Sequence, residues 1–181
     1  LANKNGHFYY YFPLGTPFVA VPFVAVAKIF GADMVRHEKI MQMLIAAMVL
    51  MASYLVMQRI ARLYLSRTGS AIAAASFLFG SSFISTGATA LWSHDFAALF
   101  ALLAIYCVLA RNAAGEEPPW WQISLLLFLA YLCRPTQILL APVILCIQCL
   151  FLDKRTAIKV GIAFVSLLLL FAGFSWHEFH Q

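Results

Sequence analysis

Long apolar segments separated by short polar breaks dominate this chain. A helix needs about 20 apolar residues to cross the hydrocarbon core of a bilayer, so segments of this kind predict transmembrane helices. The six candidate segments, of which two are short, are 40–57, 70–91, 96–110, 121–133, 136–152 and 160–176. The pattern therefore predicts an all-α, polytopic transmembrane helical protein with about six spans.

The first 39 residues do not fit this pattern. Residues 1–15 are polar and then aromatic, which is typical of a membrane–water interface. Residues 16–30 are apolar, but they are too few to cross a bilayer and include Pro17 and Pro22. They predict a short amphipathic or re-entrant helix at the outer surface. We therefore expect three regions, namely an outer interfacial segment (1–39), a transmembrane helical bundle (40–176) and the start of an outer loop (177–181).

Composition excludes the soluble classes. The chain is 64% hydrophobic and 10% charged, with a mean hydropathy of +0.88, whereas a soluble domain is about 45–50% apolar and about 25% charged. The net charge of +5 does not indicate a nucleic-acid partner, because the basic residues gather in the short gaps between apolar segments. We expect a multi-pass protein of the bacterial inner (plasma) membrane, with the lipid bilayer as its surroundings.

The distribution of basic residues predicts the orientation. The breaks 58–69, 111–119 and 153–159 together carry seven Lys and Arg residues, whereas the opposite short breaks carry only Arg134. Cytoplasmic loops are enriched in Lys and Arg, so these three breaks are predicted to be cytoplasmic. The break at 92–95, Arg134, the C-terminus and the first 39 residues then face outward.

Two short spans point to a cavity. Segments 96–110 and 121–133 hold 15 and 13 residues, or about 22 and 20 Å of helix, which is less than the roughly 30 Å hydrocarbon core. Their outer ends carry His94, Asp95 and Arg134. Ionisable groups at membrane depth are costly unless they face water or one another, so these residues predict an intramembrane site.

Each of these residues has a functional and a structural interpretation. Asp95 beside His94 could act on a sugar hydroxyl as an acid or base, or could bind a divalent metal ion, the one cofactor that the sequence suggests. Asp95 could equally cap the helix that follows it. Arg134 could bind phosphate oxygens in a bidentate manner, and Pro135 biases it away from helical geometry. The alternative for Arg134 is an interfacial arginine whose charged end reaches water.

Three other pairs of residues are candidates for a site. They are Tyr10 and Tyr11, Cys146 and Cys149, and His177 and His180. The tyrosines could contact a sugar or a lipid headgroup, although an interfacial aromatic belt is the plainer interpretation. The cysteines are expected to behave as small hydrophobic residues. The histidines are three residues apart rather than four, so the H-E-x-x-H zinc pattern is absent and no metal site is firmly predicted.

The order of these features resembles the GT-C membrane glycosyltransferases. The features are Tyr-Phe-Pro-Leu-Gly-Thr-Pro (11–17), Lys-Ile-Phe-Gly (28–31), the arginine-rich segment 59–67, Asp95 and Arg134-Pro135-Thr136. The group that they resemble depends on polyprenyl-phosphate sugars and includes protein mannosyltransferases and lipid A aminoarabinose transferases. The resemblance covers most of the chain but only part of such an enzyme.

The resemblance implies a transferase that moves a sugar from a polyprenyl-phosphate carrier to an acceptor on the outer face, by direct displacement at the anomeric carbon. Asp95 would correspond to the second acidic position of the family, and Arg134 to an arginine that holds the lipid phosphate. The family's catalytic carboxylate lies in the first outer loop, but no acidic residue precedes Asp33. We expect that catalytic residue upstream of Leu1.

Two other classes of function stay open. The first is a non-catalytic membrane subunit that packs in a larger complex through the span 70–91, which is rich in Ala, Ser and Gly. The second is a transporter, which is weaker because no inverted repeat is visible.

Overall fold

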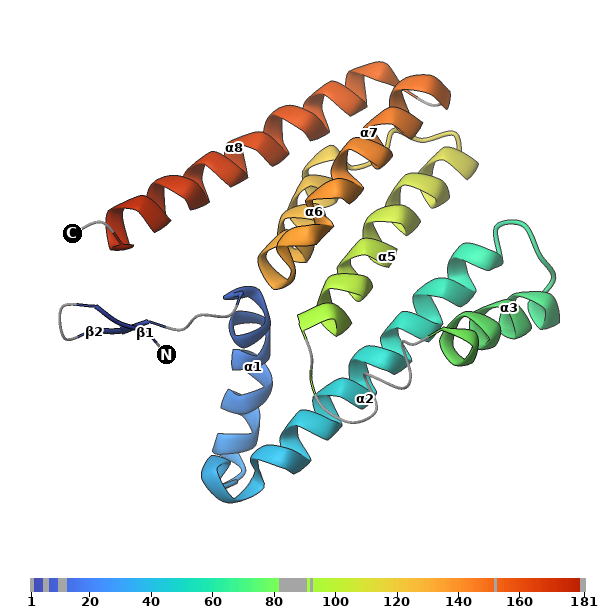
Figure 1. Cartoon of the computed structure of the whole chain (residues 1–181). Coiled ribbons are helices and arrows are strands. Elements are labelled where there is room, and N and C mark those ends of the chain that lie inside the picture. Colours follow the sequence, from blue (N-terminus) through green and yellow to red (C-terminus); the bar gives the residue numbers. More distant parts are fainter. Residues whose placement is uncertain are drawn as a thin grey trace.

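The computed structural model describes residues 2–4, 7–9, 13–81, 91, 93–151 and 153–179, and nearly all of them are helical (Figure 1). The elements are β1 (Ala2–Lys4), β2 (His7–Tyr9), α1 (Gly15–Ile29), α2 (Met34–Ala61), α3 (Arg67–Gly80), α5 (Ser93–Ala113), α6 (Trp120–Cys133), the 3₁₀ helix η1 (Pro135–Leu139), α7 (Leu140–Phe151) and α8 (Lys154–Phe179). The predicted all-α class is confirmed. The two short strands pair antiparallel, with Ala2 opposite Tyr9 and Lys4 opposite His7, and were not predicted.

Three helices are long and apolar enough to cross a membrane in the part of the chain that the structure describes. They span Arg36–Ala61, Ser93–Ala113 and Lys154–Glu178, with 26, 21 and 25 residues. The shorter apolar helices are Gly15–Ile29, Trp120–Cys133 and Pro135–Leu150. Large apolar side chains such as Leu150 and Leu170 are more than 70% exposed, as expected for surfaces that face lipid. The chain is an integral membrane protein.

The predicted 15-residue length of the segment 96–110 is wrong. Helix α5 has 21 residues, because the polar residues at both of its ends are helical as well. A helix of this length reaches about 32 Å, enough to cross the hydrocarbon core. The predicted shortness of this span therefore no longer supports a position of Asp95 below the outer surface. Helix α6, with 14 residues, is still only about 21 Å long.

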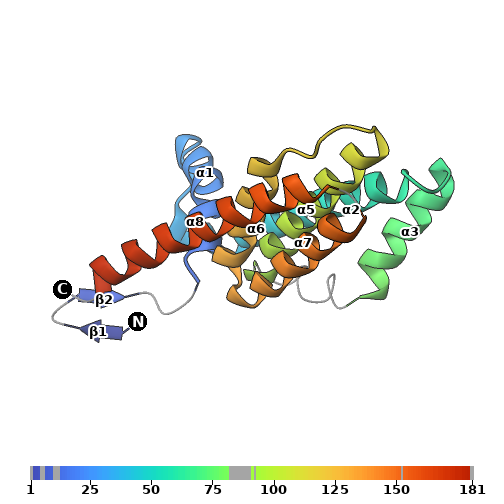
Figure 2. The ribbon, with the colours of Figure 1, turned by 90° about the horizontal axis from the view of Figure 1, so that it is seen from above.

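Two buried clusters hold the bundle together. Helices α5, α6, α7 and α8 share an aliphatic core that includes Val108, Leu127, Ile144 and Val160. The Ser124 hydroxyl of α6 lies 3.1 Å from the Val160 carbonyl oxygen of α8 and 2.7 Å from the Trp120 carbonyl oxygen of its own helix. Helix α2 packs against both α3 and α5, and α1 lies against α2, α5 and α6 (Figures 1 and 2).

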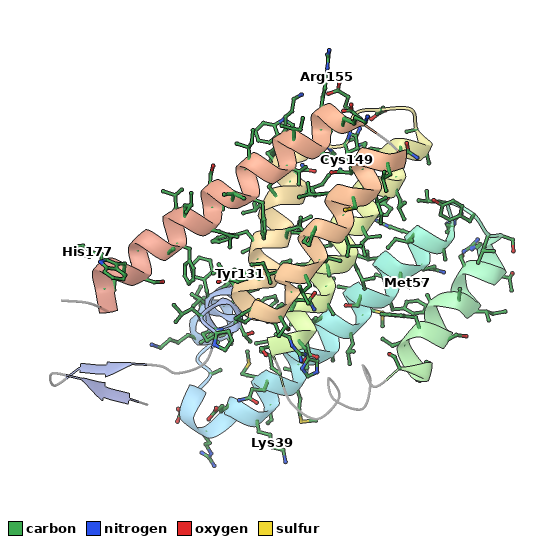
Figure 3. The ribbon with its side chains drawn as sticks, turned by 45° about the horizontal axis from the view of Figure 1, so that its top comes forward. Lys39, Met57, Tyr131, Cys149, Arg155 and His177 are labelled. Carbon is green, nitrogen blue, oxygen red and sulfur yellow. The ribbon has the colours of Figure 1, made fainter. Side chains whose placement is uncertain are left out.

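The turns that join α2 to α3, α5 to α6 and α7 to α8 lie toward one end of the bundle (Figure 1). Two ion pairs form there, Arg111 with Glu116 and Lys159 with Glu117, the second at 3.9 Å between Nζ and Oε2. Figure 3 shows Arg155 at this end and Lys39 at the other. The three basic breaks of the sequence are thus grouped as expected, and the side of the membrane that they face stays a prediction.

Asp153 directly precedes α8 at this end of the bundle. Its carboxylate accepts hydrogen bonds from the Thr156 hydroxyl at 2.6 Å and from the backbone N–H groups of Thr156 and Arg155 at 2.9 and 3.0 Å. These bonds favour the charged carboxylate, the Thr156 hydroxyl most of all, and they lower the pKa of Asp153. The residue is an N-cap for α8.

Candidate functional site

Asp95 is a fully buried carboxylate in the first turn of α5. Its side chain has 0% exposure, and its Oδ1 lies 3.5 Å from Nε2 of His94, whose side chain is 24% exposed. Asp95 is the third residue of the helix, so the expectation that it directly precedes the helix as its cap is wrong. A carboxylate in the first turn still interacts favourably with the positive end of the helix dipole.

Arg134 lies in the break between α6 and η1. Its backbone is extended, with φ −148° and ψ 106°, and Pro135 is the first residue of η1. The Arg134 Nε donates a hydrogen bond to Thr136 Oγ1 at 3.1 Å, and the side chain is otherwise exposed. No ion pair joins Arg134 to a carboxylate among the described residues. The guanidinium therefore keeps most of its donors available for an anion.

One buried cluster joins the start of α5, which holds Asp95, to the end of α6, which Arg134 follows. It contains Phe96 and Ala97, which directly follow Asp95, and Cys133, which directly precedes Arg134. Helix α2 contributes Ile45 and Val49 to the same cluster. Asp95 and Arg134 therefore lie at the same end of the bundle.

Helix α1 covers this cluster, which sequence reasoning did not anticipate. The Phe23 ring of α1 lies 6.5 Å from the Phe96 ring, measured between centroids. Gly15 is buried, and a Cβ built on it would lie 2.3 Å from the backbone nitrogen of Cys133. Only a residue without a side chain allows this approach, so Gly15 positions the end of α6. The sequence shows only a glycine at the start of a predicted helix, and this does not reveal which part of the chain packs against it.

The remaining predicted residues do not join this group. Tyr10, Tyr11 and His180 lie outside the described residues. His177 lies near the end of α8, where its Nδ1 is 3.5 Å from Glu178 Oε1. Cys146 and Cys149 are exposed on α7 as free thiols, and their behaviour as small hydrophobic residues stays a prediction.

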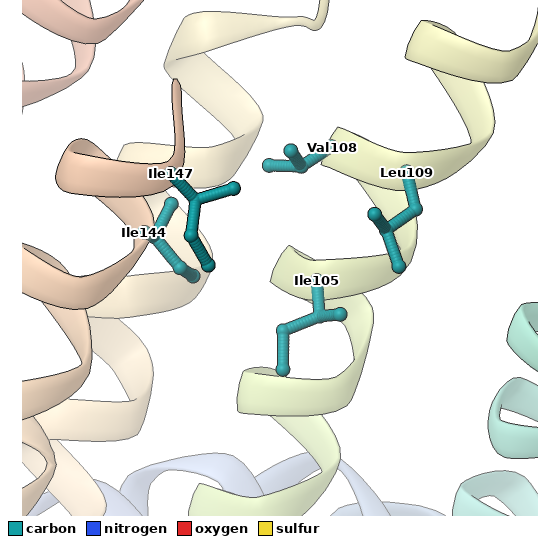
Figure 4. Close-up of a pocket in the computed structure, with 5 residues that line it drawn as sticks. All are labelled: Ile105, Val108, Leu109, Ile144 and Ile147. Carbon is teal, nitrogen blue, oxygen red and sulfur yellow. The ribbon is translucent and has the colours of Figure 1, made fainter. Parts of the chain in front are cut away.

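A metal site finds no support in the described residues. Asp95 and His94 supply two donor side chains, and no group of three or more His, Cys, Asp or Glu side chains that could hold an ion occurs in the part of the chain that the structure describes. A pocket between α5 and α7 is not a candidate metal site either. It is lined by aliphatic side chains only, among them Ile105 and Ile144 (Figure 4), so it offers no partner for a sugar or a cation.

These observations define a class of protein: an integral membrane protein of mostly helical structure, in which a buried aspartate and an exposed arginine lie at one end of the bundle, beside a cluster that a short helix covers. The family model described as dolichyl-phosphate-mannose-protein mannosyltransferase matches residues 15–177. The chain belongs to this family of GT-C membrane glycosyltransferases, which use a lipid-linked sugar donor. No curated protein and no solved structure matches the chain.

Proposed function

We propose that this chain binds a polyprenyl-phosphate sugar at the end of the bundle where Asp95 and Arg134 lie, and takes part in transferring the sugar to an acceptor at the outer face of the membrane. The observation that carries the proposal is the buried cluster of Phe96, Ala97 and Cys133, which holds the neighbours of both residues together. Family membership supports the lipid-linked donor.

Arg134 is assigned to the phosphate of the donor. In a direct displacement, the acceptor oxygen attacks the anomeric carbon, and the bond from that carbon to the phosphate oxygen breaks. The electron pair of that bond stays on the departing phosphate, whose negative charge increases. A guanidinium that donates two parallel hydrogen bonds stabilises this charge, and its exposed position next to an extended backbone leaves it accessible.

Asp95 is assigned to a hydroxyl group of the sugar or of the acceptor. A buried carboxylate accepts hydrogen bonds strongly, and His94 beside it restricts its orientation. We assign the removal of the acceptor proton to the catalytic carboxylate of the family's first outer loop, which we expect upstream of Leu1. Asp95 then orients the substrate once substrate binding has exposed its carboxylate, which is buried in this structure.

The assignment of Arg134 is tested by binding of a polyprenyl phosphate to the purified protein in detergent. Arg134→Gln should lose about 1.5–3 kcal/mol of binding free energy, the range for a hydrogen bond to a charged group. Arg134→Lys should lose less, since it keeps the charge but not the planar fork. Arg36→Gln is the matched control, because Arg36 is an exposed arginine in the first turn of α2. Unchanged affinity in both Arg134 variants would leave only an interfacial role.

The assignment of Asp95 is tested by sugar transfer with the complete protein in membranes. Asp95→Asn should abolish transfer while its melting temperature stays near that of wild type, because Asn preserves the size of the side chain. Glu38→Gln is the control, since Glu38 is an exposed carboxylate of α2. Normal transfer by Asp95→Asn would refute a substrate role. If both Arg134 variants also bound normally, the non-catalytic subunit would be the better interpretation.

A further inference from the structure

Basic residues at the end of the bundle that holds the α2–α3 turn fall into two kinds. In the α5–α6 loop and at the start of α8, they lie near acidic residues. Arg111 pairs with Glu116, and Lys159 lies 3.9 Å from Glu117. Much of the positive charge of these two loops is therefore balanced within the protein.

The arginines of the α2–α3 turn are of the other kind. Arg59, Arg62 and Arg67, which we call the arginine turn, are all exposed. The sequence contains no Asp or Glu between Glu38 and Asp95. No ion pair joins the arginine turn to a carboxylate in the part of the chain that the structure describes. Three positive charges are thus gathered without a carboxylate partner among the residues that the structure describes.

The local backbone keeps these three side chains close together. Arg59 lies in the last turn of α2, and Arg62 directly follows the helix. The Arg62 N–H still donates a helical hydrogen bond of 2.9 Å to the Gln58 carbonyl oxygen, so the two arginines, three residues apart, lie on one face. A short turn follows, closed by a hydrogen bond of 2.8 Å from the Leu65 N–H to the Ala61 carbonyl oxygen. Arg67 is the first residue of α3, where the positive end of the helix dipole disfavours another cation. An anion at this position relieves the repulsion among the three arginines and the unfavourable interaction of Arg67 with the helix dipole.

The apolar side chains of the turn indicate where the anion comes from. Tyr64 and Leu65 lie between the arginines and are 70% and 50% exposed. The turn follows directly on Ala61, the last residue of a membrane-spanning helix, and in two views it lies at the edge of the bundle (Figures 1 and 2). A tyrosine and a leucine at this level fit the headgroup region of a bilayer, where phosphates and hydrocarbon meet.

We propose that the arginine turn is a binding site for the phosphate of an anionic phospholipid. The guanidinium groups donate hydrogen bonds to the phosphate oxygens, and Tyr64 and Leu65 contact the glycerol and the first carbons of the acyl chains. The site lies on α2 and α3, away from Asp95 and Arg134, so it holds whether or not those two residues serve sugar transfer.

Native mass spectrometry of the whole chain tests this proposal. The protein is presented in neutral detergent with equal amounts of phosphatidylglycerol and phosphatidylcholine, and the ratio of the two bound lipids is measured. Wild type should retain phosphatidylglycerol preferentially. In the variant Arg59→Gln/Arg62→Gln/Arg67→Gln, this preference should fall by about fivefold for each arginine removed. The corresponding triple Lys variant should keep most of the preference, because it retains the charge.

A control variant separates a site from general charge attraction. Arg111→Gln/Lys154→Gln/Lys159→Gln removes the same charge from the neighbouring loops and should leave the lipid preference near that of wild type. Equal losses in the two Gln variants, or no preference in wild type, would overturn the proposal. Release of bound phosphatidylglycerol by millimolar inorganic phosphate would overturn it in favour of a site for free phosphate. Circular dichroism of each variant confirms that the helices are intact.

Discussion

Replacing Gly15 by alanine tests how α1 holds the end of α6. A Cβ on Gly15 would lie 2.3 Å from the backbone nitrogen of Cys133, 2.4 Å from the carbonyl carbon of Leu132 and 2.7 Å from Cα of Cys133. All three are backbone atoms, so no side-chain rotation relieves the overlap. An ordinary contact needs about 3.4 Å, so one of the two helices must move by about 1 Å.

That displacement has two measurable consequences. Overpacking of this kind costs about 1–3 kcal/mol, which lowers the melting temperature by roughly 2–4 °C per kcal/mol for a chain of this size. The movement also reaches Arg134, the residue after Cys133, and a displacement of about 1 Å in a site can reduce its activity about 100-fold. We therefore expect Gly15→Ala to be less stable in detergent and to bind polyprenyl phosphate poorly.

A glycine of α8 provides the matched control. A Cβ on Gly173 would meet nothing within 4 Å, and alanine is favoured over glycine in a helix by about 1 kcal/mol. Gly173→Ala should therefore be at least as stable as wild type and should bind the lipid normally. If Gly15→Ala matched Gly173→Ala in both measurements, the close approach of α1 to α6 would be refuted as the feature that positions Arg134.

Two further predictions concern the ends of the bundle. Because the folded state lowers the pKa of Asp153 below its ordinary value of 3.8, the stabilisation is fully present above that value and is lost as the pH falls through the lowered pKa. Melting temperatures between pH 7 and pH 3 should thus decline more steeply for wild type than for Asp153→Asn, and parallel curves would contradict the capping role. In a background without the native cysteines, Tyr64→Cys should react with impermeant reagents only from the cytoplasm, and Phe30→Cys only from outside. Both positions are exposed, and the reverse labelling would overturn the predicted orientation.

Local chemistry was sufficient to predict several elements. The short helix expected at 16–30 is α1, displaced by one residue. The break at Arg134 is extended because the ring of Pro135 restricts the residue before it. Both features follow from interactions between neighbouring residues.

Helix boundaries were harder to predict from hydropathy. The start of α5 includes Ser93, His94 and Asp95, which a hydropathy pattern assigns to a loop. Hydropathy reports which residues tolerate lipid, whereas a helix continues as long as its backbone hydrogen bonds can form. For the same reason α2 begins at Met34, inside the predicted polar connection 31–39.

The sequence alone determined that the chain is a helical membrane protein, since apolar surface in such excess can be accommodated only in lipid, where helices satisfy their own backbone groups. It also singled out Asp95 and Arg134, because charged groups are rare in such surroundings. Only the tertiary structure decided that Cys133, Phe96 and α1 meet in one cluster. That contact joins Gly15 to a residue more than 100 positions away, and no local pattern encodes it, because it depends on how the helices pack together.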